Sequence, residues 1–404
     1  MNKNLKFFAG FHVIFFMGMW ISKTVHPVHF EHAHALQNFG ISYSAMAAAG
    51  YFSFLIGHYC DRLGYRSTLA IGCVLYSLGL FLRVFPESAI ISLLSGVSAG
   101  VGASTTITSV RVWLLQISDE NSRARLLGVK GSGAALGSAI GCSVAGILAG
   151  KWLSISTETV LEIAAGLILL LSLLTFLITP APAHESISSK DKSSLFEFFL
   201  EKKIIAVWAT STGVFAGFYV SFISPYLPII MKSKGFDMTA VGISTGLLFL
   251  IRFFLDPIIG RFIQDRKENS FVIYIAAEFA VLITTAAFLS PFNQHAFVLF
   301  LILRSVGLGF STIAEDATWF KVFPQKSLGL CFGLNQSGFF LGDFLGGLVN
   351  GKLYSAMGLQ GCAVAAMAVM IINAAVFSMF LANHKRQSAI QKFEVNYSPQ
   401  APPA

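Results

Sequence analysis

The sequence contains little charge. Only 12% of its 404 residues are Asp, Glu, Lys or Arg, whereas 55% are hydrophobic. Soluble globular proteins carry about 25% charged residues, so this chain has too few to cover a water-facing surface. The composition therefore excludes a soluble enzyme, a disordered chain and a nucleic-acid-binding protein. We expect the net charge of +8 to lie in loops that face anionic lipid.

Cysteine and nucleotide-binding motifs are also missing. The five cysteines fall in or beside apolar runs and none belongs to a C-x-x-C pair, which argues against a disulfide framework and a zinc site. The chain has no G-x-x-x-x-G-K-[ST] sequence, so ATP is not expected to drive it directly. No Ser/His/Asp arrangement indicates an enzyme. We predict neither a cofactor nor a bound metal.

Long apolar runs dominate the rest of the sequence. Crossing a bilayer core about 30 Å thick takes roughly 20 residues of helix. The first run lacks a small-residue cleavage site and many others follow it, so we interpret it as an uncleaved span and not as a signal peptide. The twelve predicted spans are 7–26, 33–58, 67–84, 88–115, 127–150, 157–180, 204–230, 238–263, 270–290, 295–320, 328–351 and 358–382.

The pattern predicts two halves joined by a linker. Residues 181–203 contain Pro, Ser and alternating charge, which is typical of a linker. They separate a six-helix bundle at 1–180 from a second at 204–382, and 383–404 form a tail. With the N-terminus inside, most of the 28 Lys and Arg residues fall in cytoplasmic segments. We predict a multi-pass protein of the plasma (bacterial inner) membrane with both termini in the cytoplasm.

The two halves share a glycine pattern. GVKGSGAALGSAIGCSVAG and GLNQSGFFLGDFLGGLVNG match at one constant offset, and small residues at this spacing let helices approach closely in lipid. A parallel repeat of six helices is the layout of a transporter in which one half rocks against the other. The first set of matching residues is Gly128, Ser132, Gly133, Leu136, Gly137, Gly141 and Gly146, and the second is Gly333, Ser337, Gly338, Leu341, Gly342, Gly346 and Gly351.

The loop after the second predicted span carries the sequence GHYCDRLGYR, residues 57–66. It resembles the G-x-x-x-D-R-x-G-R-[RK] signature of the major facilitator superfamily, with Tyr65 as the one departure. The resemblance implies an all-α integral membrane protein with 12 transmembrane helices in two pseudo-symmetric six-helix halves. It also implies a loop that closes the cytoplasmic side, with Arg62 and Arg66 reaching acidic groups such as Asp119 and Glu120. The residues that match the gating signature are Gly57, Asp61, Arg62, Gly64 and Arg66.

Further family-like elements bear on direction. Gly141 to Gly146 resembles the antiporter-associated G-P-x-x-G-G element without its proline, and this implies proton-coupled efflux of a small organic solute by alternating access. Residues 225–266 resemble the family's organic-solute members, which leaves proton-coupled uptake as the alternative. Alternatives of another class are a lipid flippase, expected to show polar tracks open to the bilayer, and a non-transporting sensor, which usually appends a soluble domain.

Ionisable side chains inside the spans are candidates for the substrate cavity, because each costs several kcal/mol in lipid. In the first half, helical spacing places the candidates on one stripe with Phe16. Lys23 has a second interpretation, in which it snorkels to the outer interface. The candidate cavity residues are His12, Met19, Lys23, His26, Arg252 and Arg304.

The proton-coupling candidates are the carboxyls Glu315, Asp316, Asp343 and Asp256. Arg252 and Asp256 are four residues apart and can pair on one face of a helix. We expect Asp343 to pair with a cation on another helix, either Arg304 or Arg252. The structural alternative is a fixed network of ions that only holds helices together.

Two further expectations concern Glu278 and the first turn. We expect Glu278 to be a protonated or interfacial carboxyl on the outside of the bundle. Counting residues against the second half predicts a turn at 27–31, with the second span beginning near Ala33, and His26, His29, His32 and His34 crowding this turn. Those histidines could bind a metal, sense pH or only act as polar residues that hydrate the outer opening of the protein. We expect a monomer whose partners are protons, lipid and a partly apolar or aromatic small molecule.

Overall fold

The computed structural model describes residues 3–51, 64–117, 120–177, 203–290, 293–322 and 328–397, and their regular structure is entirely helical. The described residues between 3 and 177 form six α-helices and a short 3-10 turn. These are α1 (Lys3–His32), α2 (Leu36–Tyr51), α4 (Tyr65–Leu82), α5 (Ala89–Ile117), α6 (Glu120–Ala149), α7 (Thr157–Leu174) and η1 (Thr175–Leu177).

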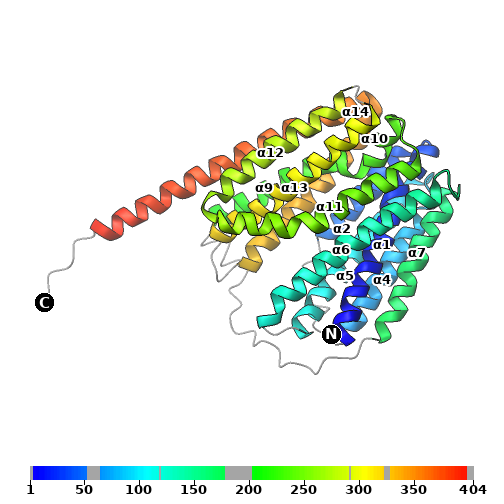
Figure 1. The fold of residues 1–404 in the computed structure, drawn as a ribbon, viewed down its shortest axis with the longest axis horizontal. Helices are drawn as coiled ribbons and strands as arrows, with labels where there is room; N and C mark the ends of the chain where they lie inside the picture. The colour runs from blue at the N-terminus through cyan, green and yellow to red at the C-terminus, as the bar shows by residue number, and fades with distance from the viewer. Residues whose placement is uncertain are drawn as a thin grey trace.

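The described residues from 203 to 397 form a second set of helices. Its elements are α9 (Lys203–Ile223), η3 (Ser224–Tyr226), α10 (Leu227–Ser233), α11 (Met238–Asp265), η4 (Lys267–Asn269), α12 (Ser270–Ala286), η5 (Ala287–Leu289), α13 (Gln294–Val322) and α14 (Leu328–Tyr397). Gly358 has φ 61° and ψ −159°, so it divides α14 into two helices. The last part of α14 projects away from the bundle (Figure 1).

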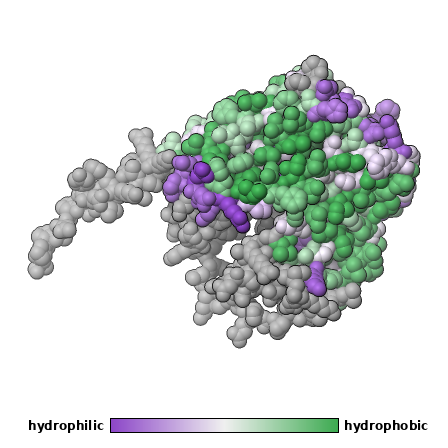
Figure 2. Space-filling model, in the orientation of Figure 1, coloured by the Kyte–Doolittle hydropathy of each residue, from purple (hydrophilic) through white to green (hydrophobic). Residues whose placement is uncertain are grey.

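Ten helices in the described residues are long and apolar enough to cross a membrane. Their bounds follow the predicted spans closely, which confirms a multi-pass, all-helical membrane protein. The predicted linker 181–203 lies outside the described residues except for Lys203, where α9 begins. Figure 2 shows a broad hydrophobic face over the helices, with hydrophilic residues gathered toward its edges.

The predicted turn at residues 27–31 is wrong. Helix α1 continues through Pro27 to His32, the turn occupies residues 33–35 with His34 at φ 55°, and α2 begins at Leu36. A proline inside a helix removes one hydrogen-bond donor, but membrane-spanning helices tolerate this when neighbours pack around it. Val28 and Phe30 after Pro27 are fully buried, and this packing holds the last turn of α1 in place.

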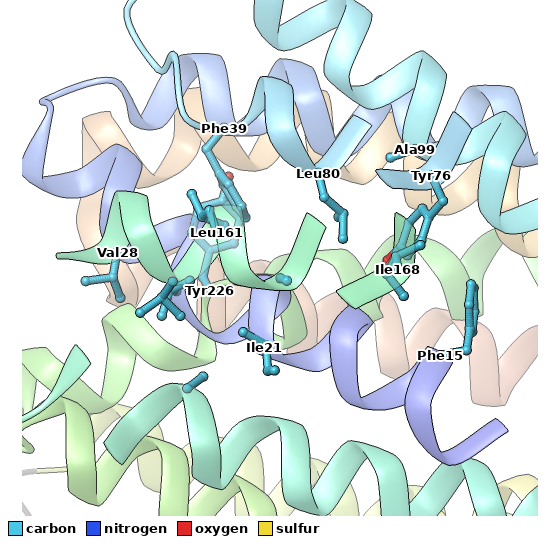
Figure 3. Close-up of a cluster of buried hydrophobic side chains, with 14 of the residues drawn as sticks. Phe15, Ile21, Val28, Phe39, Tyr76, Leu80, Ala99, Leu161, Ile168 and Tyr226 are labelled. Carbon is cyan, nitrogen blue, oxygen red and sulfur yellow. The ribbon is translucent and has the colours of Figure 1, made fainter. Parts of the chain in front are cut away.

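The core of the first half forms where α1, α4, α5 and α7 meet. Figure 3 shows Phe15 and Ile21 of α1 beside Tyr76 and Leu80 of α4, with Ile168 of α7 closing the cluster. All five side chains are at most 2% exposed. Dispersion contacts between such side chains, and not water exclusion, stabilise helix packing in lipid.

The repeated glycines make equivalent contacts in the two halves. A Cβ added at Gly137 of α6 would collide with the carbonyl of Val13 in α1, and one at Gly342 of α14 would collide with the carbonyl of Val214 in α9. In both halves, the fifth long helix therefore packs backbone to backbone against the first. This is the close approach that the glycine pattern predicts.

The two halves meet most closely at the end of the bundle that carries the α1–α2 turn, here called the turn end. Gly146 of α6 lies against Gly242 of α11, and Gly40 of α2 lies against Gly347 of α14. At the opposite end, where α1 begins, the space beside Gly131 of α6 and Gly260 of α11 is open. The helices that join the halves therefore diverge away from the turn end (Figure 1).

Candidate functional site

The predicted stripe on α1 does not face a single space. His12 is 2% exposed and donates from Nδ1 to the Phe8 carbonyl at 2.7 Å, with its ring against Phe8 and Phe11. Met19 packs half-buried against the hydrophobic core. His12 therefore belongs to the interior of the first half, and it does not lie at the contact between the halves.

Lys23 lies where the two halves meet. Its Nζ is 5.1 Å from the centre of the Trp20 ring, and that ring packs at 4.4 Å against Phe249 of α11 in the other half. The Lys23 side chain is half-buried and close enough to Asp343 of α14 for the two charges to interact. The aromatic contact was not predicted, because Trp20 and Phe249 look like ordinary apolar residues of a span.

Asp343 forms a hydrogen bond between the halves. It is 6% exposed, and its Oδ1 accepts a hydrogen bond of 2.9 Å from the Tyr43 hydroxyl of α2. The expected cation partners lie elsewhere, since Arg252 pairs with Asp256 and Arg304 donates to Thr285. The two named arginines are therefore the wrong partners, whereas a cation on another helix, Lys23 of α1, does interact with the carboxylate, beside the neutral donor Tyr43.

Arg83 is a buried cation at the end of the predicted span 67–84 that was not among the candidate site residues. It is 2% exposed, donates to the Ser22 hydroxyl at 2.8 Å and approaches the Met46 sulfur. Arg83 is the C-cap of α4 and reaches inward between α1 and α2. Its position inside the predicted span 67–84 was the signal that could have marked it.

The pairing predicted on α11 is confirmed. Arg252 donates to both carboxylate oxygens of Asp256, at 2.8 and 2.9 Å. Both side chains are partly exposed, at 28% and 37%, and they lie against Gly309 of α13. This fork geometry is the strongest arrangement of a guanidinium and a carboxylate.

Glu278 is not on the outside of the bundle as expected. It is 3% exposed and accepts a hydrogen bond from the Ser311 hydroxyl of α13. Arg304 of α13 and Tyr219 of α9 lie near the same carboxyl. A carboxyl on α12 turns inward here because α13 supplies a hydroxyl and a cation, which lower the cost of burying it.

The adjacent carboxyls of α13 have different surroundings. Glu315 is half-buried and accepts a hydrogen bond of 3.2 Å from the Trp319 indole. Asp316 is exposed at the protein surface. Neighbouring residues on a helix point about 100° apart, so the two carboxyls share an electrostatic environment but not a contact.

The predicted gating motif is described only at its end, since Gly57, Asp61 and Arg62 lie outside the described residues, as does Asp119. Gly64 has φ 78°, a left-handed conformation that favours glycine, and it caps the start of α4. Arg66 donates to the carbonyls of Thr175 and Phe176 at the end of the first half, with its guanidinium 5.6 Å from the Phe176 ring centre.

The four histidines near the first turn do not converge. His26 is buried between Phe30 and Phe39, whereas His29 bonds Thr157 at 3.0 Å and the Val84 carbonyl at 3.2 Å. His32 meets Lys232 of the second half, and His34 lies in the turn itself. Since each ring points to a different neighbour, they form no common site.

Two ion pairs join the halves at the turn end. Lys232 of α10 lies 2.9 Å from Glu31 of α1, and Lys151 after α6 lies 3.3 Å from Asp237 before α11. Asp237 also accepts a hydrogen bond from the Ala240 amide as the N-cap of α11, and this bond lowers the pKa of its carboxyl below the usual range. Both pairs hold the halves together at the turn end.

Comparison with known proteins agrees with this architecture. Residues 7–317 match the profile of the Major Facilitator Superfamily. The chain belongs to this superfamily. Its members are transporters and not enzymes. A quinolone resistance protein, NorA of Staphylococcus aureus (strain COL), is 22% identical over 307 residues, which cover 74% of this chain and 76% of NorA.

Solved structures of transporters share the fold. A bacterial homolog of the human lysosomal transporter Spinster, in an inward-facing and unoccupied conformation, matches with TM-score 0.72 and 14% identity over 99% of this chain and 100% of that one. The nucleoside transporter NupG matches with TM-score 0.73 and 17% identity, over 93% and 98%. A D-xylose-proton symporter matches with TM-score 0.66 and 14% identity, over 91% and 96%.

Proposed function

We propose that this protein is a proton-coupled secondary transporter that moves a small organic solute by alternating access. It has twelve spans in two pseudo-symmetric halves. The equivalent glycine contacts in the two halves support this arrangement. The observation that carries the proposal is the Tyr43–Asp343 hydrogen bond, because it places a buried carboxyl on the contact between the halves. The substrate is taken up between them, near Lys23 and the Trp20–Phe249 pair, and these groups suit a partly aromatic solute.

Protonation of Asp343 can be linked to movement through this contact. The ionised carboxylate accepts the Tyr43 hydrogen bond and attracts Lys23 of the first half. A protonated carboxyl loses that attraction and about half of the strength of the hydrogen bond, so the halves separate more readily. Glu315 and Asp316 carry protons within the second half, and Asp256 is held by Arg252 until that pair opens.

The direction we propose is efflux. NorA is a quinolone resistance protein, and resistance is the outcome expected when a drug is moved out of a cell. The glycines of the antiporter-like element are present at Gly141 and Gly146, where they pack against α1 and α11. Proton-coupled uptake remains the second candidate, because NupG and the D-xylose-proton symporter share the fold.

The orientation we propose is a plasma-membrane monomer with both termini in the cytoplasm. The turn end, closed by the Glu31–Lys232 and Lys151–Asp237 pairs, then faces outward. The conformation described here is the one open toward the cytoplasm. A reporter enzyme fused within residues 181–203 tests this orientation, since it should be active only in the cytoplasm, and periplasmic activity would overturn it.

Transport in proteoliposomes tests the function. The wild type, under an imposed pH gradient, should accumulate one or more members of a pool of aromatic solutes and dyes. Asp343→Asn and Tyr43→Phe should each reduce this accumulation by about tenfold, as expected for losing a charge-assisted hydrogen bond. The exposed Glu87→Gln is the matched control and should transport normally. Equal accumulation with and without the pH gradient would exclude proton coupling.

A further inference from the structure

A crevice opens on the lipid-facing side of the second half, between α12 and residues 370–378 of α14. Its volume is about 240 Å³. Phe279 on one wall and Ile371 on the other are each 56% exposed, so the crevice opens toward the bilayer. Every lining residue is apolar except Glu278 and Ser378.

Glu278 is the one acidic residue that lines this crevice. One of its oxygens accepts the Ser311 hydrogen bond, and Arg304 of α13 and Tyr219 of α9 lie near the carboxyl. The other oxygen, Oε2, is buried, and no donor among the described residues bonds it with suitable geometry. An unsatisfied buried carboxylate oxygen costs free energy until a donor reaches it.

The charges around Glu278 favour a cation as that donor. Glu278 interacts electrostatically with Arg304, and Glu315 of α13 interacts with Glu278 in turn. The cluster therefore combines two carboxyls with one guanidinium. When both carboxyls are ionised, it is one positive charge short of neutrality.

We propose that this crevice binds an amphiphilic amine that enters from the lipid. Its ammonium group donates a hydrogen bond to Glu278, and its aryl or alkyl body packs between Phe279, Ile371 and Ala375. An apolar pocket with one placed charge is the usual form of a site for such a ligand. The site is separate from the contact between the halves, so it does not depend on the function proposed above.

The amine and Glu278 form the same ion pair whether the proton arrives on the carboxyl or on the amine. A neutral amine that meets a protonated Glu278 accepts the carboxyl proton on its nitrogen, which leaves an ammonium and a carboxylate in contact. A charged amine that meets an ionised Glu278 forms the same pair directly. The bound state is therefore an ion pair, and an alcohol of the same shape cannot form it.

Fluorine NMR of fluorophenylbutylamine tests the proposal. The full-length protein is placed in nanodiscs of zwitterionic phosphatidylcholine, so that lipid charge does not attract the probe, and no pH gradient is applied. We expect saturable binding of the amine, and binding of the matching alcohol weaker by about tenfold or more, as expected for losing an ion-paired hydrogen bond. Equal binding of the two, or no saturable binding, would overturn the proposal.

Three variants locate the site. Glu278→Gln should weaken amine binding by about tenfold, and Ala375→Phe, which fills the crevice and keeps the carboxyl, should abolish it. Ala276→Phe is the matched control, since this exposed α12 residue does not line the crevice, and it should bind normally. If Glu278→Gln does not fold, Ala375→Phe and the alcohol decide the question. Unchanged binding in Ala375→Phe would show that the probe only dissolves in lipid.

Discussion

Single charges within the spans of this protein are stabilised by different kinds of partner. Arg252 has a carboxylate four residues away on its own helix, and that spacing was enough to predict the pair. Asp343 has a tyrosine hydroxyl from the other half, and Arg83 has a serine hydroxyl and a methionine sulfur. Neutral partners on other helices leave no pattern in the sequence, so a charge alone does not reveal them.

Variants of Glu315 and Asp316 test whether the carboxyls of the second half carry protons. If they do, Glu315→Gln or Asp316→Asn should reduce pH-driven accumulation to the level seen without a gradient, while solute exchange without a gradient continues. If the network is structural, expression and thermal stability should fall together instead. Intact pH-driven accumulation in both variants and in Asp343→Asn would contradict proton coupling through these groups.

At the scale of helices, the glycine repeat sets which elements touch. Gly137 and Gly342 bring the fifth long helix of each half against the first, and Gly146 and Gly242 bring the halves together. The glycine pattern predicted a close approach between helices, but it did not identify the partner helix. Phe39 of α2 and Tyr226 of η3 add an aromatic contact across the halves at 5.0 Å.

Replacing a packing glycine should destabilise one half. Gly137→Val would overlap the Val13 carbonyl and is expected to lower the free energy of unfolding by about 1–3 kcal/mol, as overpacking generally does. The equivalent Gly342→Val should have a similar effect. Gly166→Val on the exposed face of α7 is the control, because open space surrounds that position. Thermal unfolding of the purified variants is the measurement, and equal stability of all three would refute this account of the repeat.

At the scale of the molecule, the halves are closed at one end by two ion pairs and the α6–α11 contact. Because Glu31 and Lys232 are about 30% exposed, with side-chain values of 31% and 26%, water screens them. The pair therefore favours the conformation that is closed at the turn end, but it is too weak to prevent opening. Release of such weak contacts is what a rocking movement of two rigid halves requires.

A charge swap tests this closure. Glu31→Lys and Lys232→Glu should each raise the fraction of molecules open at the turn end by up to about fivefold, since exposed pairs contribute up to ~1 kcal/mol. The double swap should restore the wild-type distribution. Distances between spin labels at the exposed Glu87 and His295, one in each half, report the opening. A double variant as open as the single ones would show that the pair does not act in closure.

The sequence by itself determined the superfamily and the all-helical, membrane-spanning architecture, because helix length and polarity respond to the bilayer at each position. The sequence did not predict that α1 continues through Pro27, because the burial of Val28 and Phe30 decided whether the helix continued. The inward turn of Glu278, the hydrogen bond from Tyr43 to Asp343 and the separate neighbours of the four histidines were decided only by tertiary structure. Each depends on which helix lies opposite, since Ser311 is 33 positions from Glu278 and Asp343 is 300 positions from Tyr43.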